Sequence, residues 1–283
     1  YGKLPLSFET NQGQAGAQVK FLSRGAGYTL LLTGEGAVFS LRGRSLLRNH
    51  PAEFAWLAVG SIPLWLIFEA YNLRLANWIY VGLPENWWLR QLGYAWAFAT
   101  IWPGIFETAI FLRERGWNVP EPATATRPPK PAPPAVAIAS PLVGLLFVTV
   151  PVLVPTAIGA YLFGAVWLGF IFLLEPVNNW MGRESLWRDI RSGDSTRLRA
   201  LLWSGMLCGI LWEFWNHLAA AQWFYTFPIL QDWKIFAMPL PGYLGFPAFA
   251  VECFAMFSFI APWLGWITDL STRDPYYILP VSM

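Results

Sequence analysis

Residues 138–176 contain a single charged side chain, Glu175. A transmembrane helix needs about 20 apolar residues, so this stretch is nearly twice as long as one span requires. Pro151 and Pro155 lie near its middle, where each would interrupt a continuous helix. The stretch therefore predicts two membrane-spanning helices joined by a tight hairpin, with one long tilted helix as the alternative.

Four further stretches are apolar and long enough to cross a bilayer. Hydrophobic residues make up 55% of the chain and charged residues 13%, whereas soluble domains carry about 25% charged residues. The sequence thus predicts an all-α integral membrane protein with about six transmembrane helices and the lipid bilayer as its first partner. The additional spans are expected at 53–72, 91–112, 198–221 and 243–266.

The membrane part is expected to form two related halves, 51–113 and 138–283. Between them, residues 114–137 form a linker rich in Pro, Ala and Thr, which favours an extended polyproline-like coil over a helix. In the second half, residues 180–192 are charged and amphipathic, and this pattern is typical of a helix that lies on the membrane surface. Leu186, Trp187 and Ile190 are expected to face lipid, and Arg183, Arg188 and Arg191 to face water.

Residues 1–50 form a separate segment that is polar and rich in glycine. Short alternating runs broken by glycines predict short strands with a hairpin. Residues 1–45, with LPLSFETNQGQ and VKFLSRGAGYTLLLTGEGAVFSLRG, resemble the start of a β-rich domain in secreted bacterial repeat proteins. That resemblance implies a location outside the cytoplasm.

The distribution of Lys and Arg predicts the orientation in the membrane, because cytoplasmic loops are enriched in both. The N-terminal segment, the linker and the loop before residue 198 are rich in these residues, whereas the other side has only Arg74, Arg90 and Lys234. We therefore expect a multi-pass protein of the bacterial inner membrane with both termini in the cytoplasm. The resemblance of residues 1–45 argues for the opposite side.

Two segments repeat one order of residues: Glu-x-x-Asn, then Trp-x-Tyr, then Pro, and later a second Pro and Glu. Repeats in membrane proteins often build a site where the two halves meet. Chance is the alternative in a chain with 18 Trp and 23 Pro. The first copy is Glu69, Asn72, Trp78, Tyr80 and Glu107, and the second is Glu213, Asn216, Trp223, Tyr225 and Glu252.

The carboxyl groups of these repeats are functional candidates, because a charged side chain in hydrocarbon costs about 2.5–3.5 kcal/mol or more. A rise of about 1.5 Å per residue places Glu69, Glu213 and Glu252 at a similar depth, with Glu107 about 8–10 Å nearer the cytoplasm. Three ionised groups at one depth would repel one another, so we expect at least one protonated acid. Residues i and i+3 share a helix face, so each Asn is expected to bond the Glu of its own repeat.

The order of Glu, Trp-x-Tyr, Pro and Glu resembles the lycopene cyclase domain of the heterodimeric bacterial type, over 53–112 and 157–268. The resemblance implies that an intramembrane acid, here Glu213 or Glu252, protonates an isoprenoid. The family's Pro-x-Glu-Glu motif is replaced here by a single Glu at longer spacing from Pro103 and Pro247. From Phe172 onward, the chain also resembles uncharacterised bacterial multi-span proteins with a Trp-Glu-Phe-Trp-Asn motif, which implies no activity.

Three functions are compatible with these features, and a purely structural role, with each Glu hydrogen-bonded between helices, is a fourth alternative. We expect a non-catalytic subunit of a larger membrane assembly that binds lipid, carotenoid or another pigment. An enzyme of the lycopene cyclase type, with Glu213 and Glu252 as catalytic acids, is the first alternative, and a proton- or cation-coupled transporter is the second. The candidate ligand-binding residues are Glu69, Asn72, Trp78, Tyr80, Glu107, Trp212, Trp215, Asn216, Trp223 and Tyr225.

Other kinds of site receive little support from the sequence. The formal net charge of +2 and the lack of a basic stripe indicate no nucleic-acid partner. No metal site is predicted. His217 shares a helix face with Glu213 and is a candidate metal or pigment ligand, although a histidine hydrogen-bonded within the protein is the alternative.

Overall fold

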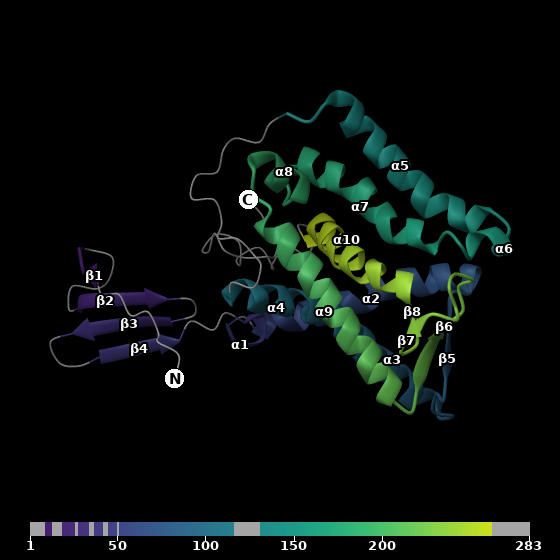
Figure 1. Cartoon of the computed structure of the whole chain (residues 1–283), viewed down its shortest axis with the longest axis horizontal. Helices are drawn as coiled ribbons and strands as arrows, with labels where there is room; N and C mark the ends of the chain where they lie inside the picture. Colours follow the sequence, from purple (N-terminus) through teal and green to yellow (C-terminus); the bar gives the residue numbers. More distant parts are fainter. Residues whose placement is uncertain are drawn as a thin grey trace.

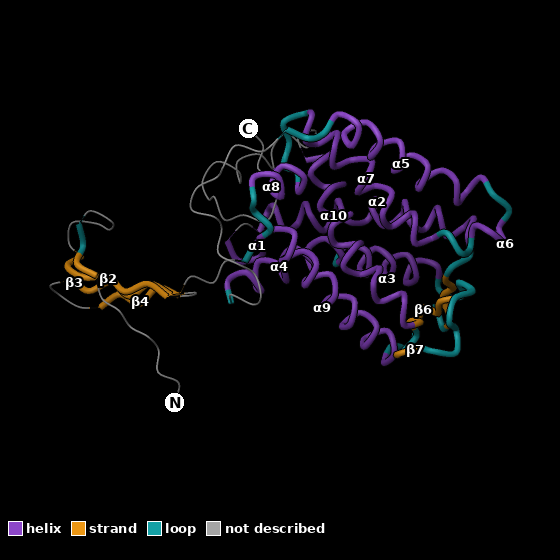
Figure 2. Tube along the Cα trace, turned by 45° about the horizontal axis from the view of Figure 1, so that its top comes forward, coloured by secondary structure: helices purple, strands orange, loops and turns teal. Residues whose placement is uncertain are grey.

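The computed structural model describes residues 9–12, 19–25, 28–33, 37–41, 45–49, 51–115 and 131–261. Long helices pack around one hydrophobic core, and a small sheet at the N-terminus lies apart from them (Figures 1 and 2). Helices α1 and α8 lie at one end of the helical body, whereas α6 and the strands β5 and β6 lie at the other (Figure 1). The fold is that of an all-α integral membrane protein with a short β-rich N-terminal segment, as the sequence predicted.

The N-terminal sheet has four antiparallel strands in sequence order. They are β1 (Glu9–Thr10), β2 (Val19–Gly25), β3 (Tyr28–Thr33) and β4 (Ala37–Leu41). The predicted short strands and hairpin are therefore confirmed.

The first half of the membrane body contains α1 (Leu46–Asn49), α2 (Pro51–Leu75), α3 (Trp87–Ala99) and α4 (Ile101–Glu114). The predicted span at 91–112 is broken at Thr100. At the break, the Ser61 hydroxyl of α2 donates to the Phe98 carbonyl (2.5 Å) and accepts from the Trp102 amide (3.1 Å). Pro103 lies in the first turn of α4, where its missing N–H is harmless, so the break precedes the proline.

The second half begins with α5 (Pro134–Leu153), earlier than the predicted residue 138. Pro134 occupies the first helical position, where its fixed φ suits a helix start. Most of the predicted linker at 114–137 lies outside the described residues.

Helices α5 and α7 (Phe163–Trp180) form the predicted helical hairpin, joined through the short α6 (Thr156–Gly159), and the single long helix is excluded. Two glycines bring the pair together. A Cβ on Gly144 would lie 2.3 Å from the Leu173 amide nitrogen, and one on Gly169 would lie 2.5 Å from Val148 Cγ1. Small residues allow such close backbone approach between membrane helices.

The predicted surface helix at 180–192 is shorter than expected. Helix α7 runs to Trp180, and α8 covers Leu186–Ser192 only. Leu186, expected to face lipid, is 3% exposed and belongs to the core, whereas Ile190 is 49% exposed. The expectation for Leu186 was wrong because this first residue of α8, which follows the Ser185 cap, packs into the core of the helical body.

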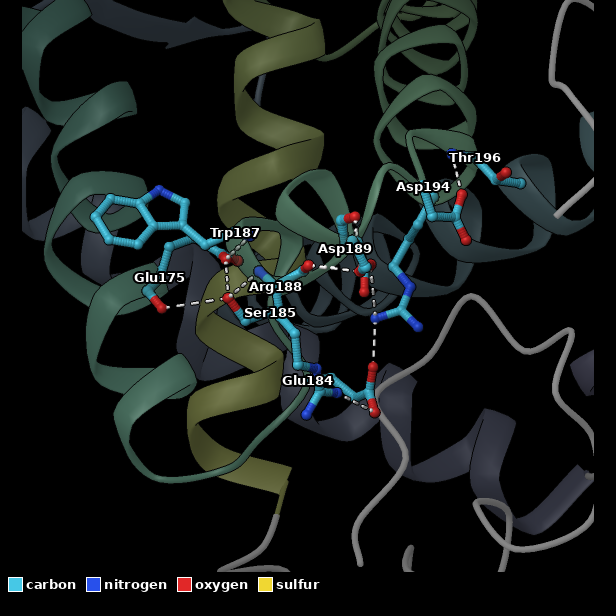
Figure 3. Close-up of polar contacts among 10 residues, drawn as sticks. Glu175, Glu184, Ser185, Trp187, Arg188, Asp189, Asp194 and Thr196 are labelled. Atoms are coloured by element: carbon cyan, nitrogen blue, oxygen red, sulfur yellow. Dashed lines mark hydrogen bonds and ion pairs between the residues drawn. The ribbon is translucent and has the colours of Figure 1, made fainter. Parts of the chain in front are cut away.

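Ion pairs hold α8 against its neighbours (Figure 3). Glu184 accepts from Arg188 at 2.9 Å and from Arg197 at 2.6 Å, and Arg197 also lies 3.4 Å from Asp189. Burial raises the pKa of Asp189, and the charge of Arg197 opposes that rise. Arg183, Arg188 and Arg191, which were expected to face water, are only partly exposed, and Arg188 pairs with an acidic side chain of the protein.

The last described elements are α9, three short strands, a 3-10 helix and α10. The predicted span at 198–221 corresponds to α9, and that at 243–266 corresponds in part to α10, with its last residues outside the described part. Helix α10 packs against both α7 and α9. The bounds are α9 (Thr196–Leu218), β6 (Gln222–Tyr225), β7 (Lys234–Ile235), β8 (Met238–Pro239), the 3-10 helix η1 (Leu240–Leu244) and α10 (Gly245–Ile260).

Among the described residues, four helical stretches are long and apolar enough to cross a membrane: Pro51–Leu75, Trp87–Arg113, Pro134–Leu153 and Leu240–Ile260. Helices α7 and α9 are not among them. The predicted number of six spans therefore stays a prediction.

Candidate ligand site at the paired repeats

The two Trp-x-Tyr segments of the repeats pair with each other. They form β5 (Trp78–Val81) and β6, which are antiparallel neighbours in a two-stranded sheet. In their register, Trp78 lies opposite Tyr225 and Tyr80 lies opposite Trp223. This reciprocal register is the one that a two-fold related pair of repeats produces.

The two asparagines make matching hydrogen bonds. Asn72 donates to the Trp78 carbonyl at 2.9 Å and accepts from the Trp78 amide at 3.0 Å. Asn216 does the same with Trp223, at 2.9 Å for both bonds. We expected each Asn to orient the Glu of its repeat, but these amides satisfy the backbone just beyond a helix end, where partners are lacking. They hold the start of each strand.

Glu69 accepts three hydrogen bonds on a single oxygen, Oε1. The donors are Trp65 Nε1 (2.7 Å), Trp78 Nε1 (3.3 Å) and the Tyr80 hydroxyl (2.5 Å). All three partners donate, so Glu69 Oε1 acts only as an acceptor. Its bond from the Tyr80 hydroxyl is the shortest of the three. Glu69 therefore anchors three aromatic side chains at one point.

Glu213 is bound in the same way by the second repeat. Its Oε1 accepts from Trp223 Nε1 at 3.1 Å and from the Tyr225 hydroxyl at 2.9 Å. The residue is 0% exposed, and its other oxygen, Oε2, has no hydrogen-bond partner in the described part of the chain. In both repeats, a single carboxylate oxygen, Oε1, receives the donors from the rings.

Tyr80 and Tyr225 remain neutral donors. Burial raises the pKa of both phenols, and the charge of the neighbouring carboxylate, Glu69 for Tyr80 and Glu213 for Tyr225, raises it further. Each phenol therefore keeps its proton and donates it to a carboxylate.

The structure places the remaining two carboxyl groups elsewhere. Glu107 accepts from the Ser45 hydroxyl (3.0 Å) and the Leu47 amide (2.7 Å), so it binds the start of α1. Glu252 is 0% exposed within α10, and neither of its oxygens has a hydrogen-bond partner among the described residues. It shares no bonding partner with Glu213. Glu252 was expected to meet Glu69 and Glu213, but no hydrogen bond joins it to them among the described residues. Glu107, which was expected at another depth, is bound at α1.

Other residues expected at the site are scattered. Trp212 packs edge-on against Phe246, with ring centroids 6.4 Å apart, and Trp215 is 57% exposed. His217 lies beside the ring of Phe236, at 5.4 Å. Over the described residues, no group of three His, Cys, Asp or Glu side chains could hold a metal ion.

An apolar pocket of about 320 Å³ lies beside the paired strands, with Trp78 and Tyr225 in its wall. Small-molecule sites span about 300–1,000 Å³, so the pocket is at the lower end of that range. Helix α7 contributes Phe163 and Trp167, and the loop after β6 contributes Phe227. These rings pack edge to face, with Trp78 and Phe163 5.1 Å apart.

Sequence reasoning missed the residues that α7 contributes to this pocket. Their aromatic character is ordinary for a membrane helix, and only the packing of α7 against the paired strands singles them out. The lack of a side chain at Gly245 also shapes the pocket wall, because a Cβ there would lie 1.5 Å from the Trp167 ring. That ring can therefore lie directly on the first residue of α10.

Comparison with known proteins finds short matches to one kind of membrane protein. Membrane protein insertase YidC of Neisseria meningitidis and of Neisseria gonorrhoeae is 54% identical over 48 residues, which are 16% of this chain and 9% of the relative. The same insertase of Azotobacter vinelandii is 78% identical over 23 residues, 8% of this chain and 4% of the relative. The chain therefore spans less than a tenth of the length of these relatives. No family model and no solved structure matches it.

These matches and the apolar helices agree on the location. The protein is a multi-pass protein of the bacterial inner membrane. The orientation of its termini stays a prediction from the distribution of Lys and Arg. The insertase activity is named for relatives of which this chain spans only a small part.

Proposed function

We propose that this protein is a non-catalytic membrane subunit that holds the apolar part of a lipid, carotenoid or other pigment in the pocket beside β5 and β6. One observation carries the proposal. The two rings that both repeats contribute to the pocket wall, Trp78 and Tyr225, have their polar atoms bound to Glu69 and Glu213. Each ring is thus fixed with its polar end on a carboxylate, which leaves aromatic surface for a ligand.

The composition of the pocket supports an apolar ligand. Its lining is dominated by aromatic and aliphatic side chains, and none of the described lining residues is Asp, Glu, Lys, Arg or His. A site whose side chains are already held in place loses little conformational freedom when a ligand binds. Tyr161 and Leu244, which are 54% and 73% exposed, form its outer edge. A chain could therefore enter from outside the helix bundle.

Filling the pocket tests this proposal. Gly164 of α7 lines the pocket and is exposed, and a Cβ added there would meet no atom within 4 Å. Gly164→Phe should therefore occupy the pocket without disturbing the fold, and it should lower the amount of lipid or pigment that co-purifies at the site at least tenfold. Mass spectrometry and absorption spectra of the purified protein measure this loss.

Gly93→Phe provides the matched control. Gly93 is also an exposed helical glycine with open space around it, but it lies in α3, outside the pocket lining. The control should keep the bound molecule. Equal retention by both variants would refute a ligand in this pocket.

A catalytic role of the lycopene cyclase type is a second candidate. It is favoured by the complete burial of Glu213, a carboxyl group held beside the aromatic rings of Trp223 and Tyr225. Loss of a cyclised isoprenoid product in cells expressing Glu213→Gln would support the enzyme. An unchanged product would leave the binding subunit as the better account.

A further inference from the structure

Both carboxylates of the paired repeats lie directly behind rings of the pocket wall. Trp78 donates its indole N–H to Glu69 at 3.3 Å, and Tyr225 donates its hydroxyl to Glu213 at 2.9 Å. Each carboxyl group is therefore separated from the pocket by one aromatic ring, Trp78 for Glu69 and Tyr225 for Glu213. Donation to an anion also increases the electron density on a ring, and the face of an aromatic ring already carries partial negative charge.

No positive charge offsets this arrangement within the pocket wall. The described lining contains no Lys, Arg or His. The nearby cation of α2, Arg74, donates to the hydroxyl of Thr156 and to the Val154 carbonyl, and neither of these residues is in the lining. The pocket thus combines aromatic faces with two carboxyl groups behind them.

We propose that the pocket selects a ligand that carries a quaternary ammonium group on an apolar chain. This inference rests on the proposed function, because it names the chemical class of the bound molecule. Aromatic faces attract a cation through their quadrupole, and the attraction is larger when the cation has left water. A trimethylammonium group has no N–H to satisfy, so it can enter a pocket that offers few hydrogen-bond acceptors.

The same arrangement disfavours an anionic ligand. A sulfate or phosphate inside this wall would face Glu69 and Glu213 across a single ring, with no cation in the described lining to receive it. A neutral chain would fill the pocket but would gain nothing from the carboxylates. The charge at the end of the ligand is therefore the property that the structure discriminates.

Three probes of matched shape test the inference on the full chain in nanodiscs. Each carries a photoreactive diazirine in the middle of an alkyl chain. The first ends in trimethylammonium, the second in the isosteric neutral tert-butyl group, and the third in sulfate. Labelling of the pocket segments of β5 and α7 is measured by mass spectrometry, relative to labelling of the exposed face of α5.

The trimethylammonium probe should label the pocket on the order of tenfold more than the tert-butyl probe, and the sulfate probe should stay at background. Equal labelling by the cationic and neutral probes would overturn the selectivity while leaving the proposed function in place. No pocket labelling by any probe would overturn both. This comparison uses the wild-type chain and does not depend on how a variant folds.

Two charge-removing variants locate the origin of the preference. Glu69→Gln and Glu213→Gln keep an acceptor for the ring donors but remove the negative charge. Each should reduce the ratio of labelling by the cationic probe to labelling by the neutral probe to about threefold. Glu107→Gln is the control, because its carboxylate binds Ser45 and Leu47 instead of a pocket ring. An undiminished preference in both charge-removing variants would contradict the role of the carboxylates.

Discussion

The glutamates and the asparagines of the two repeats bind different kinds of group. Glu69 and Glu213 bind the polar ends of aromatic rings, whereas Asn72 and Asn216 bind the backbone of the following strand. Sequence spacing identified all four residues, but spacing on a helix could not reveal which group each would bind. The chain leaves the helix soon after each Asn, and the free backbone groups of the strand compete for its amide.

We predict that Asn216→Ala lowers the stability of the protein. Asn216 is 3% exposed, and its removal leaves the amide and carbonyl of Trp223 without their partner. An unsatisfied buried polar group costs about 1–3 kcal/mol. Thermal unfolding in detergent should show a clearly lower Tm, whereas Gln222→Ala, which removes one exposed bond to the His217 carbonyl, should change little. Equal Tm values for the two variants would argue against this role of Asn216.

Helical elements were easier to predict than their ends. The apolar runs at 53–72 and 138–176 predicted α2 and the α5–α7 hairpin, because length and hydrophobicity alone require such helices. The break at Thr100 depends on Ser61 of another helix, and Leu186 is buried just after the cap at Ser185. A contact between distant residues sets the first feature, and the packing of Leu186 into the core shared with distant residues sets the second.

The close packing of α5 and α7 leads to a prediction at this scale. Gly144→Leu would place a side chain against the backbone of Leu173, with the first carbon 2.3 Å from its amide nitrogen. The backbone cannot move aside as a flexible side chain can, so the hairpin should open, with a loss of about 1–3 kcal/mol or more. Limited proteolysis and Tm measurements check this. Gly93→Leu, which enters open space, should behave as the wild type, and a wild-type Gly144→Leu would contradict the packing.

The whole molecule is organised by the meeting of its two halves. The repeat was visible in the sequence as two matching orders of residues, but the sequence did not show that the copies pair as strands. It also could not show that α7 completes a pocket beside them. The sequence placed Glu69, Glu213 and Glu252 at one depth, whereas the structure joins only Glu69 and Glu213 to the rings of the paired strands by hydrogen bonds. Residue depth along a helix does not tell which way a side chain points.

A disulfide cross-link between the two repeats tests this organisation most directly. Ile79 and Phe224 lie opposite each other in the register of β5 and β6, and both side chains are exposed. Opposite residues have Cβ atoms about 4.5–5.5 Å apart, close enough for a disulfide after small adjustment. With Cys208 and Cys253 replaced by Ala, Ile79→Cys combined with Phe224→Cys should cross-link rapidly on mild oxidation. The displaced pair Val81→Cys and Phe224→Cys should react far more slowly, whereas equal rates for the two pairs, or no cross-link in either, would contradict the paired repeats.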